Sequence, residues 1–511
     1  MNLSKMTWTV VLIAGTAGMA QGGDWGQWGR TLTKNFYSPE KGLVHEFEAG
    51  DYKSGTEEID METTKNVRWA AKLGSQSYGN VTVANGRVYV GTNNDSPRDP
   101  KHKGDRGIVM CLDEKTGKFL WQLVVPKLSA GQVSDWEYIG ICSSPTVDGE
   151  RVYVVSNRCE IVCLDANGLA NGNDGFQGEA QYMAGPDNPP IAPGETDADI
   201  LWVYNMQEEL GIFPHNMTSS SVLIVGDKVY ASTSNGQDYL HESVPFPESP
   251  CLVVLDKMTG KYVGEEASGI SEHMFHCNWS SPGFGDANGS RMVLFGGGDG
   301  VCYAYKPDPV KKGETSILEE IWKFDCVPDK YKTRDGEPIE YPDAEGPSEC
   351  IATPVFYKNR VYIGIGQDPE HGEGVGYLAC IDATKKGDIT KDGAIWTYDK
   401  INRTLSTVSI DPDTGLLFVS DFSGFVYCLD ADTGEEHWIY DMKAHVWGST
   451  MVADGKVYIG DEDGDVVVLE ASKEKKLLHE VYFGSPIYST PVAANGAVYV
   501  GTQSHLYSIG K

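Results

Sequence analysis

The stretch STPVAANGAVYVGTQSHLYSI, which runs from Ser489 to Ile509, decides the fold of this 511-residue chain. It contains a small polar pair, a short apolar run, a tight turn, and a second run that ends in Val-Tyr-Val. Short apolar runs rich in β-branched residues, joined by a tight Asn-Gly turn, are typical of a two-stranded hairpin. The stretch therefore predicts two antiparallel strands.

The same hairpin recurs seven more times along the chain. The other copies are Gly79–Thr92, Ser143–Ser156, Ser220–Thr233, Ser280–Gly297, Ala352–Ile365, Ser406–Asp421 and Ser449–Asp461. A second half follows each copy and is clearest in Cys111–Trp121 and Cys428–Trp438, which share the pattern Asp-x3-Gly-x3-Trp. The Asp and Gly predict the turn between the third and fourth strands, and the Trp is expected on the outer strand, against the next unit. Four strands in each of eight units predict an all-β chain that forms an eight-bladed β-propeller of four-stranded blades.

The ends of the chain predict how this ring closes. The eighth copy ends at Ile509 without an outer strand, and residues 66–73 (NVRWAAKL) precede the first copy with a spare Trp69. We expect this N-terminal segment to join the last blade, because closure hides sheet edges that an open array would expose. The predicted organisation is a signal peptide at 1–20, an N-terminal extension at 21–65 and one propeller domain at 66–511.

The first twenty residues have the pattern of a secretory signal peptide. Lys5 precedes an apolar stretch from Met6 to Gly15, and Gly18 and Ala20 occupy the cleavage positions before Gln21. This stretch is too short to cross a bilayer as a helix. We expect cleavage and a periplasmic or secreted protein with no transmembrane helix; a buried N-terminal helix is the alternative. The first cysteine is Cys111, so no lipid-attachment cysteine follows the apolar stretch.

Charge and cysteine content exclude several classes of function. The chain has 42 Lys and Arg against 73 Asp and Glu, a net charge of −31. Such an acidic surface disfavours nucleic acids and anionic membranes. No CxxCH motif occurs, so covalently bound haem is not expected.

The eleven cysteines divide into two groups. Four occupy one repeated strand position and are expected as buried small residues: Cys111, Cys163, Cys380 and Cys428. Among the rest, Cys142 with Cys159 and Cys326 with Cys350 are candidate disulfide pairs, since export permits disulfides.

Polar and aromatic residues precede the inner strands and are expected at the mouth of the propeller channel. The predicted ligand-binding residues are Glu137, His215, Asn216, His276, Asn278, Trp279, Glu349, Arg403, His445 and Trp447; Asp135, Trp136, His273 and Asn402 lie beside them in the sequence. They predict a pocket for a polar, planar or anionic ligand, with Arg403 as its charge partner and tryptophan as its wall. The alternative is a layer of hydrogen-bonded side chains that fills the channel.

Long insertions separate the early repeats. The repeated anchor residues from Tyr89 to Phe418 lie 56 to 77 residues apart, whereas those from Phe418 to Tyr499 lie 40 and 41 apart. Connections of this length indicate a binding or gating role for the inserted face, or merely tolerated surface.

Metal and catalytic signals are weak. The run DANGLANGNDG offers Asp165, Asn167, Asn173 and Asp174 as oxygen ligands for calcium, although a set of turns explains the same residues. The four histidines ahead of the inner strands show no HxH or HExxH spacing. There is no GxSxG motif, and no residue is predicted to be catalytic.

The two clearest motifs, Asp113-Gly117-Trp121 and Asp430-Gly434-Trp438, resemble those of the PQQ-like (quinoprotein alcohol dehydrogenase-like) propellers. The resemblance covers nearly all of the chain from Trp25 onward. That family contains calcium- and PQQ-dependent dehydrogenases and non-enzymatic scaffolds of the BamB type. The dehydrogenase resemblance would imply an adjacent Cys-Cys disulfide over the quinone, but this chain has no Cys-Cys dipeptide.

Three functions are open at this point. The first is an exported binding or scaffold protein for a protein, a glycan or a small polar ligand, without a cofactor. The second is an alcohol or sugar dehydrogenase that uses PQQ and calcium. The third is another enzyme, a lyase or a hydrolase, built on a propeller. Fold alone does not choose among them.

Overall fold

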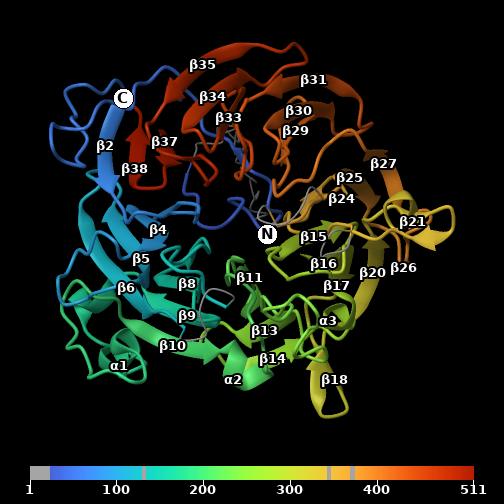
Figure 1. The fold of residues 1–511 in the computed structure, drawn as a ribbon, viewed down its shortest axis with the longest axis horizontal. Helices are drawn as coiled ribbons and strands as arrows, with labels where there is room; N and C mark the ends of the chain where they lie inside the picture. Colours follow the sequence, from blue (N-terminus) through green and yellow to red (C-terminus); the bar gives the residue numbers. More distant parts are fainter. Residues whose placement is uncertain (1–22, 129–133, 342–346, 369–373) are drawn as a thin grey trace, which may run out of the picture.

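The computed structural model describes residues 23–128, 134–341, 347–368 and 374–511 (Figure 1). Its sheets are arranged as blades around a central axis. The predicted signal peptide lies outside the described residues. No helix in the described part of the chain is long and apolar enough to cross a membrane.

Eight four-stranded sheets form the ring, as the sequence predicts. Blades 1 and 2 contain β3 (Thr82–Ala84), β4 (Arg87–Asn93), β5 (Arg106–Asp113) and β6 (Phe119–Pro126), then β7 (Thr146–Asp148), β8 (Arg151–Ser156), β9 (Glu160–Asp165) and β10 (Ile200–Asn205). Blades 3 and 4 contain β11 (Leu223–Val225), β12 (Lys228–Ser232), β13 (Leu252–Asp256) and β14 (Tyr262–Glu265), then β15 (Gly283–Ala287), β16 (Ser290–Gly296), β17 (Val301–Tyr305) and β20 (Glu320–Asp325).

The second half of the ring repeats this order. Blades 5 and 6 contain β23 (Val355–Tyr357), β24 (Arg360–Ile365), β25 (Tyr377–Asp382) and β27 (Ala394–Tyr398), then β28 (Ser409–Ile410), β29 (Leu416–Ser420), β30 (Phe425–Asp430) and β31 (Glu436–Asp441). Blades 7 and 8 contain β32 (Met451–Ala453), β33 (Lys456–Gly460), β34 (Asp465–Glu470) and β35 (Leu477–Tyr482), then β36 (Val492–Ala494), β37 (Ala497–Gly501), β38 (His505–Ile509) and β2 (Val67–Lys72).

The remaining elements are short and lie in the connections. They are β18 (Val310–Lys312), β19 (Thr315–Ile317), β21 (Thr333–Arg334), β22 (Glu337–Pro338), β26 (Gly387–Asp388), α1 (Glu179–Ala184), α2 (Met206–Leu210), α3 (Ile270–His273) and the 3-10 turns η1 (Gly168–Asn171) and η2 (Asp329–Tyr331).

The predicted closure of the ring is confirmed. β2 pairs antiparallel with β38, with Ala70 opposite Tyr507 and Lys72 opposite His505. Figure 1 shows this N-terminal strand beside the C-terminal one. The last blade is thus built from both ends of the chain, which removes its free edge.

The N-terminal segment also enters the channel, which the sequence analysis does not foresee. Residues 25–38 run along the inner strands and include β1 (Tyr37–Ser38), which pairs parallel with β32. Backbone hydrogen bonds tie the segment to the inner strands of five blades: Trp25 to Val83, Gly26 to Val147, Leu32 to Phe284, Thr33 to Phe356 and Phe36 to Val452. We call residues 25–38 the N-terminal plug.

The structure contains neither of the two candidate disulfides, Cys142–Cys159 and Cys326–Cys350. All eleven are free thiols, and ten are buried. The four cysteines of the repeated strand position are fully or almost fully buried, as predicted. Cys326 and Cys350 share one apolar cluster with Cys302, between blades 4 and 5.

Candidate functional site

An axial cavity of about 290 Å³ lies above the N-terminal plug. Its walls come from all eight blades, and the plug contributes Trp28. Trp28 is held by a hydrogen bond from its indole Nε1 to Thr353 Oγ1 at 3.1 Å. The N-terminal plug therefore fills one part of the channel, and the cavity occupies the part beside it.

Aromatic side chains dominate the walls of the cavity. They are Trp28, Tyr78, Trp136, Trp279, Trp447 and Tyr488. Tyr78 and Tyr488 stack with ring centroids 4.4 Å apart, and the Trp447 ring meets the Tyr488 ring edge-on at 5.4 Å. Hydrogen bonds fix two tryptophans: Trp279 Nε1 donates to the carbonyl of Met217 at 3.0 Å, and Trp447 Nε1 donates to Glu462 Oε2 at 3.0 Å. These rings are rigid flat surfaces.

A ring of small polar side chains surrounds the axis where each inner strand begins. In six of the eight blades a backbone N–H donates to the side-chain oxygen of the next blade: Ser144 to Ser221, Ser221 to Ser281, Thr353 to Thr407, Thr407 to Ser449, Ser449 to Thr490 and Thr490 to Asn80, at 2.7 to 3.3 Å. We call these residues the hydroxyl ring. It explains the small polar pair at the start of each repeat, because that pair joins neighbouring blades.

Besides residues of the hydroxyl ring, the cavity lining contains an amide and a carboxylate. Asn216 and Asp368 both line the cavity, and Asn216 Nδ2 donates to Asp368 Oδ2 at 3.1 Å. The described lining contains no lysine or arginine. Arg403 lies outside this lining, with its guanidinium 4.6 Å from the Phe422 ring centroid and Nη1 donating to the carbonyl of Asp368.

The predicted site residues thus separate into several places. Asn216, Trp279 and Trp447 line the cavity. Asn278 is buried and structural, since its amide donates to the carbonyl of Asn235 and accepts from Gly298 N–H. Glu137 is exposed, and Glu349 is buried, with Oε2 accepting from Cys277 N–H at 3.3 Å. His445 is exposed and stacks on the Phe422 ring, which Arg403 also contacts.

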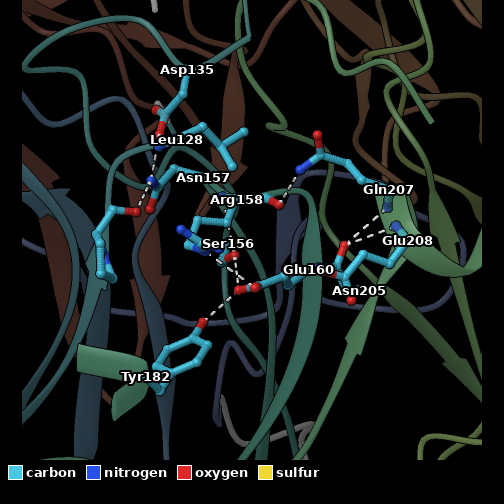
Figure 2. Close-up of polar contacts among 11 residues, drawn as sticks. Leu128, Asp135, Ser156, Asn157, Arg158, Glu160, Tyr182, Asn205, Gln207 and Glu208 are labelled. Atoms are coloured by element: carbon cyan, nitrogen blue, oxygen red, sulfur yellow. Dashed lines mark hydrogen bonds and ion pairs between the residues drawn. The ribbon is translucent and has the colours of Figure 1, made fainter. Parts of the chain in front are cut away.

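Asp135 is part of a buried network that Figure 2 shows at the connection between blades 1 and 2. Its carboxylate accepts from Asn157 Nδ2 at 2.7 Å and from Leu128 N–H at 2.9 Å, and it pairs with Lys127. Burial raises the pKa of Asp135, and Lys127 opposes that shift. This acid anchors a connection and is not among the described residues that line the cavity.

The same figure shows how the first large insertion is attached. Glu160 in β9 accepts from Tyr182 Oη in α1 at 2.7 Å and from Ser156 Oγ at 3.1 Å. Asn205 caps α2, with its Oδ1 accepting from Gln207 and Glu208 N–H. The Tyr182–Glu160 hydrogen bond therefore ties the insertion between β9 and β10 to blade 2, and the Asn205 cap fixes α2 at the end of β10.

The four residues proposed for calcium make separate contacts. Asp165 Oδ1 accepts from Asn167 N–H at 2.7 Å, and Asn167 Oδ1 accepts from Arg87. Asn173 contacts Gln177 and Glu179 through its side chain, and Asp174 N–H donates to Asp199. These contacts are those of a turn-rich loop, and calcium there stays a prediction.

Three histidines converge beside the cavity. His215 Nε2 lies 2.8 Å from His276 Nε2 and 3.1 Å from His241 Nε2. His215 and His276 are buried, whereas His241 is partly exposed. The His276 ring meets the cavity residue Trp279 edge-on at 5.0 Å. His273, three residues earlier, is exposed at the end of α3.

Several residues of the site are absent from the sequence analysis. Tyr78 and Tyr488 precede inner strands, in the position that identified Trp279 and Trp447, so the same rule would have found them. His241 and Asp368 lie in connections between the second and third strands of blades 3 and 5, whereas the sequence pattern points to the residues ahead of the inner strands. Trp28 belongs to the plug, and no pattern in the sequence indicates that position.

The comparisons with known proteins agree with the fold. A family model described as outer membrane protein assembly factor BamB matches residues 58–269 and 423–509, more than half of the chain. The crystal structure of BamB from Moraxella catarrhalis aligns with a TM-score of 0.52 at 14% identity, over 87% of this chain and 97% of that one.

Quinoprotein dehydrogenases share the architecture as well. The quinohemoprotein alcohol dehydrogenase of Comamonas testosteroni aligns with a TM-score of 0.61 at 13% identity, over 97% of this chain and 82% of that structure. In sequence it is 25% identical over 146 residues, which cover 25% of this chain and only 20% of the dehydrogenase. At these identities the structural likeness concerns the fold.

Proposed function

The chain belongs to the family of outer membrane protein assembly factor BamB, and from this premise we propose that it is an exported, non-enzymatic binding protein whose axial cavity takes a single carbohydrate unit. The observation that supports this ligand is the wall of six aromatic side chains around a cavity of about 290 Å³. A sugar ring has an apolar C–H face, which packs on aromatic rings. It also has hydroxyl groups at its rim, which form hydrogen bonds.

The polar groups at the cavity suit an uncharged ligand. Asn216 and Asp368 supply an amide and a carboxylate, and the described lining has no cation that would attract an anion. Trp279 and Trp447 are fixed by hydrogen bonds from their indoles, so little side-chain freedom is lost when a ligand binds. A protein or another small polar ligand, the alternative occupants, would use the inserted connections around the same mouth.

Carbohydrate titration tests this proposal. We would add glucose, N-acetylglucosamine and their short oligomers to the purified protein and follow tryptophan fluorescence and heat. We expect saturable binding of at least one sugar, weakened at least about fivefold by Trp279→Ala and by Trp447→Ala, since one ring contact contributes about 1 kcal/mol or more. Tyr482→Ala is the matched control, because Tyr482 is an exposed aromatic residue on the outer strand β35.

A quinoprotein oxidoreductase is the second candidate, because of the alignment with the Comamonas dehydrogenase. PQQ carries three carboxylates, and the described cavity lining offers one carboxylate, Asp368, and no lysine or arginine. The described lining does not fit this cofactor. Titration of PQQ with calcium present separates the two candidates: tight one-to-one binding would overturn the non-enzymatic proposal, and absence of heat and of a thermal shift would support it.

Export is also part of the proposal. It rests on the charged start, apolar stretch and small residues of the first twenty positions. Mass spectrometry of the protein from its native host should give an N-terminus at Gln21. An N-terminus at Met1 would contradict export by this signal.

The name of the family suggests a protein partner at an outer membrane as a further candidate ligand of the inserted face. Cross-linking in cells would identify that partner.

A further inference from the structure

The three histidines described beside the cavity come from three different connections. His215 lies between α2 and β11, His241 lies between β12 and β13 of blade 3, and His276 lies between α3 and β15. Their three ligand-type nitrogens all lie within 4.8 Å of one another. Among the described residues, His, Cys, Asp or Glu side chains converge closely enough to hold a metal ion in this group of three.

Short β-bridges hold the three connections together. Pro214 pairs with Asn235, and Gly236 pairs with Cys277. Gln237 N–H also donates to the carbonyl of His276 at 2.9 Å. Gly236 is required at this crossing, because a Cβ there would lie 2.5 Å from His215 Cβ. The backbone structure therefore brings together the three connections that carry these histidines.

One histidine has the hydrogen bond that metal-binding histidines commonly make. His215 Nδ1 lies 2.7 Å from the carbonyl of Gln237. A carbonyl only accepts, so Nδ1 carries the proton, and in the neutral ring Nε2 presents its single lone pair to the other two histidines. Such a bond from the second ring nitrogen to a carbonyl orients a ligating imidazole.

In this geometry, the single lone pair on His215 Nε2 faces more nitrogen atoms than it can accept hydrogen bonds from. Two nitrogens approach it, at 2.8 and 3.1 Å, but one lone pair accepts one good hydrogen bond. A metal ion among the three Nε2 atoms would use all three lone pairs at once. Nitrogens bound to one tetrahedral zinc ion at about 2.0 to 2.1 Å lie about 3.3 Å apart, so small shifts of the rings would suffice.

We propose that His215, His241 and His276 bind one divalent first-row transition metal ion through their Nε2 atoms. Three imidazoles suit zinc, copper, nickel or iron, and disfavour calcium and magnesium, which take oxygen ligands. Three protein ligands leave a further coordination position open. Cys277 is nearby, but its Sγ is directed to the carbonyls of Ser234 and His215.

The site is adjacent to the axial cavity without being part of its described lining. His276 packs edge-on against Trp279, and Asn216, the neighbour of His215 in sequence, lines the cavity. A bound ion would therefore lie one side chain away from the ligand proposed above. This inference does not depend on the identity of that ligand.

Metal titration of purified, untagged protein tests the proposal. After removal of metals with a chelator, we would titrate Zn²⁺ by calorimetry and Co²⁺ by visible absorption. We expect one ion per chain, a cobalt spectrum typical of nitrogen ligands in a four-coordinate site, and a rise in Tm with Zn²⁺, since an ion that binds the native state stabilises it.

Single substitutions locate the ion. His276→Gln and His241→Gln should each weaken Zn²⁺ binding at least about tenfold, which is the smallest loss usually seen even for groups that only support a ligand. His273→Gln is the matched control and should leave the affinity unchanged, because His273 is exposed in the same segment. If His276→Gln does not fold, the partly exposed His241 still gives a usable variant. Failure of the wild type to bind Zn²⁺ or Co²⁺, or unchanged affinity in His241→Gln, would overturn the proposal.

Discussion

The indole Nε1 of Trp121 in blade 1 donates a hydrogen bond to the carbonyl of Ala166 in blade 2, at 3.0 Å. Its ring lies so close to Gly168 that a Cβ there would be 2.9 Å from the indole. Four more tryptophans make the same bond to the following blade: Trp69 to Glu114, Trp202 to Lys257, Trp396 to Ala431 and Trp438 to Ser472, at 2.8 to 3.2 Å. The outer-strand tryptophan thus joins each of these blades to the next.

Trp322 of blade 4 is the exception. It is fully buried, yet its Nε1 has no hydrogen-bond partner within the described residues. The corresponding turn of blade 5 is enlarged, and its Gly387 pairs with Trp322 as part of β26. The turn that supplies the accepting carbonyl in the other blades thus has a different form here, and no described residue accepts a bond from Trp322 Nε1.

Replacing each tryptophan with phenylalanine should separate the hydrogen bond from the ring packing. Trp121→Phe should lower the free energy of unfolding by about 1 to 2 kcal/mol more than Trp322→Phe does, because only Trp121 leaves a buried carbonyl without its donor. Urea unfolding of the two variants and the wild type measures this difference. Equal losses in the two variants would show that these indole bonds contribute little beyond packing.

The ring, its closure and the tryptophan contacts could be predicted from the sequence because each rests on a local, repeated pattern. The Asn-Gly turns and Val-Tyr-Val runs indicate hairpins, and the missing outer strand after Ile509 indicates that residues 66–73 close the ring. Trp279 and Trp447, which the sequence analysis selected for their position ahead of an inner strand, line the cavity, and their role in ligand binding stays a prediction.

The rest of the site depends on contacts that no local pattern records. Trp28 reaches the cavity only because the N-terminal plug runs along the channel, and its segment has no repeat to compare with. His241 joins His215 and His276 through bridges between three separate connections. Arg403 was predicted as a charge partner, but its contacts with Phe422 and the carbonyl of Asp368 could not be read from its position in the chain.

The hydroxyl ring gives a second pair of variants. Ser449 Oγ accepts from Thr407 N–H at 2.9 Å, whereas Ser144 Oγ has no partner within the described residues. Both serines are buried. Ser449→Ala should cost about 1 to 3 kcal/mol, because a buried N–H loses its acceptor, and Ser144→Ala should cost close to nothing. The two Tm values, measured side by side, check this; a larger loss for Ser144→Ala would contradict the role of the ring.

The plug should contribute strongly to stability through Asn35. Its side chain is buried and pairs twice with Ile410: Nδ2 donates to the carbonyl at 2.8 Å, and Oδ1 accepts from the N–H at 2.7 Å. Asn35→Ala leaves both backbone groups of an inner strand unpaired and should cost about 2 to 4 kcal/mol. Thr31→Ala, at an exposed position of the same segment, should cost less than about 0.5 kcal/mol. Denaturant unfolding compares the two, and similar losses would contradict this role of Asn35.

Lys34 should make stability depend on pH. It is fully buried in the plug, its Nζ donates to Gln27 Oε1 at 3.0 Å, and burial lowers its pKa to about 7 from an ordinary value of 10.5. Between those two values the unfolded chain binds one more proton than the native protein, so stability rises with pH across this interval. Below about pH 7 both states carry the charge, and the native state keeps the full penalty of a buried ammonium.

Lys34→Met removes this titration while it keeps a long apolar side chain at the same backbone conformation, φ +62°. We therefore expect the variant to be more stable than the wild type at pH 6, and this advantage should shrink as pH rises from 7 towards 10. Each unit of difference in pKa corresponds to about 1.4 kcal/mol, so the change should be readily measured by urea unfolding at several pH values. Other titrating groups affect both proteins alike and cancel in the difference. An advantage of Lys34→Met that stays constant from pH 6 to pH 10 would show that Lys34 keeps an ordinary pKa in the native protein.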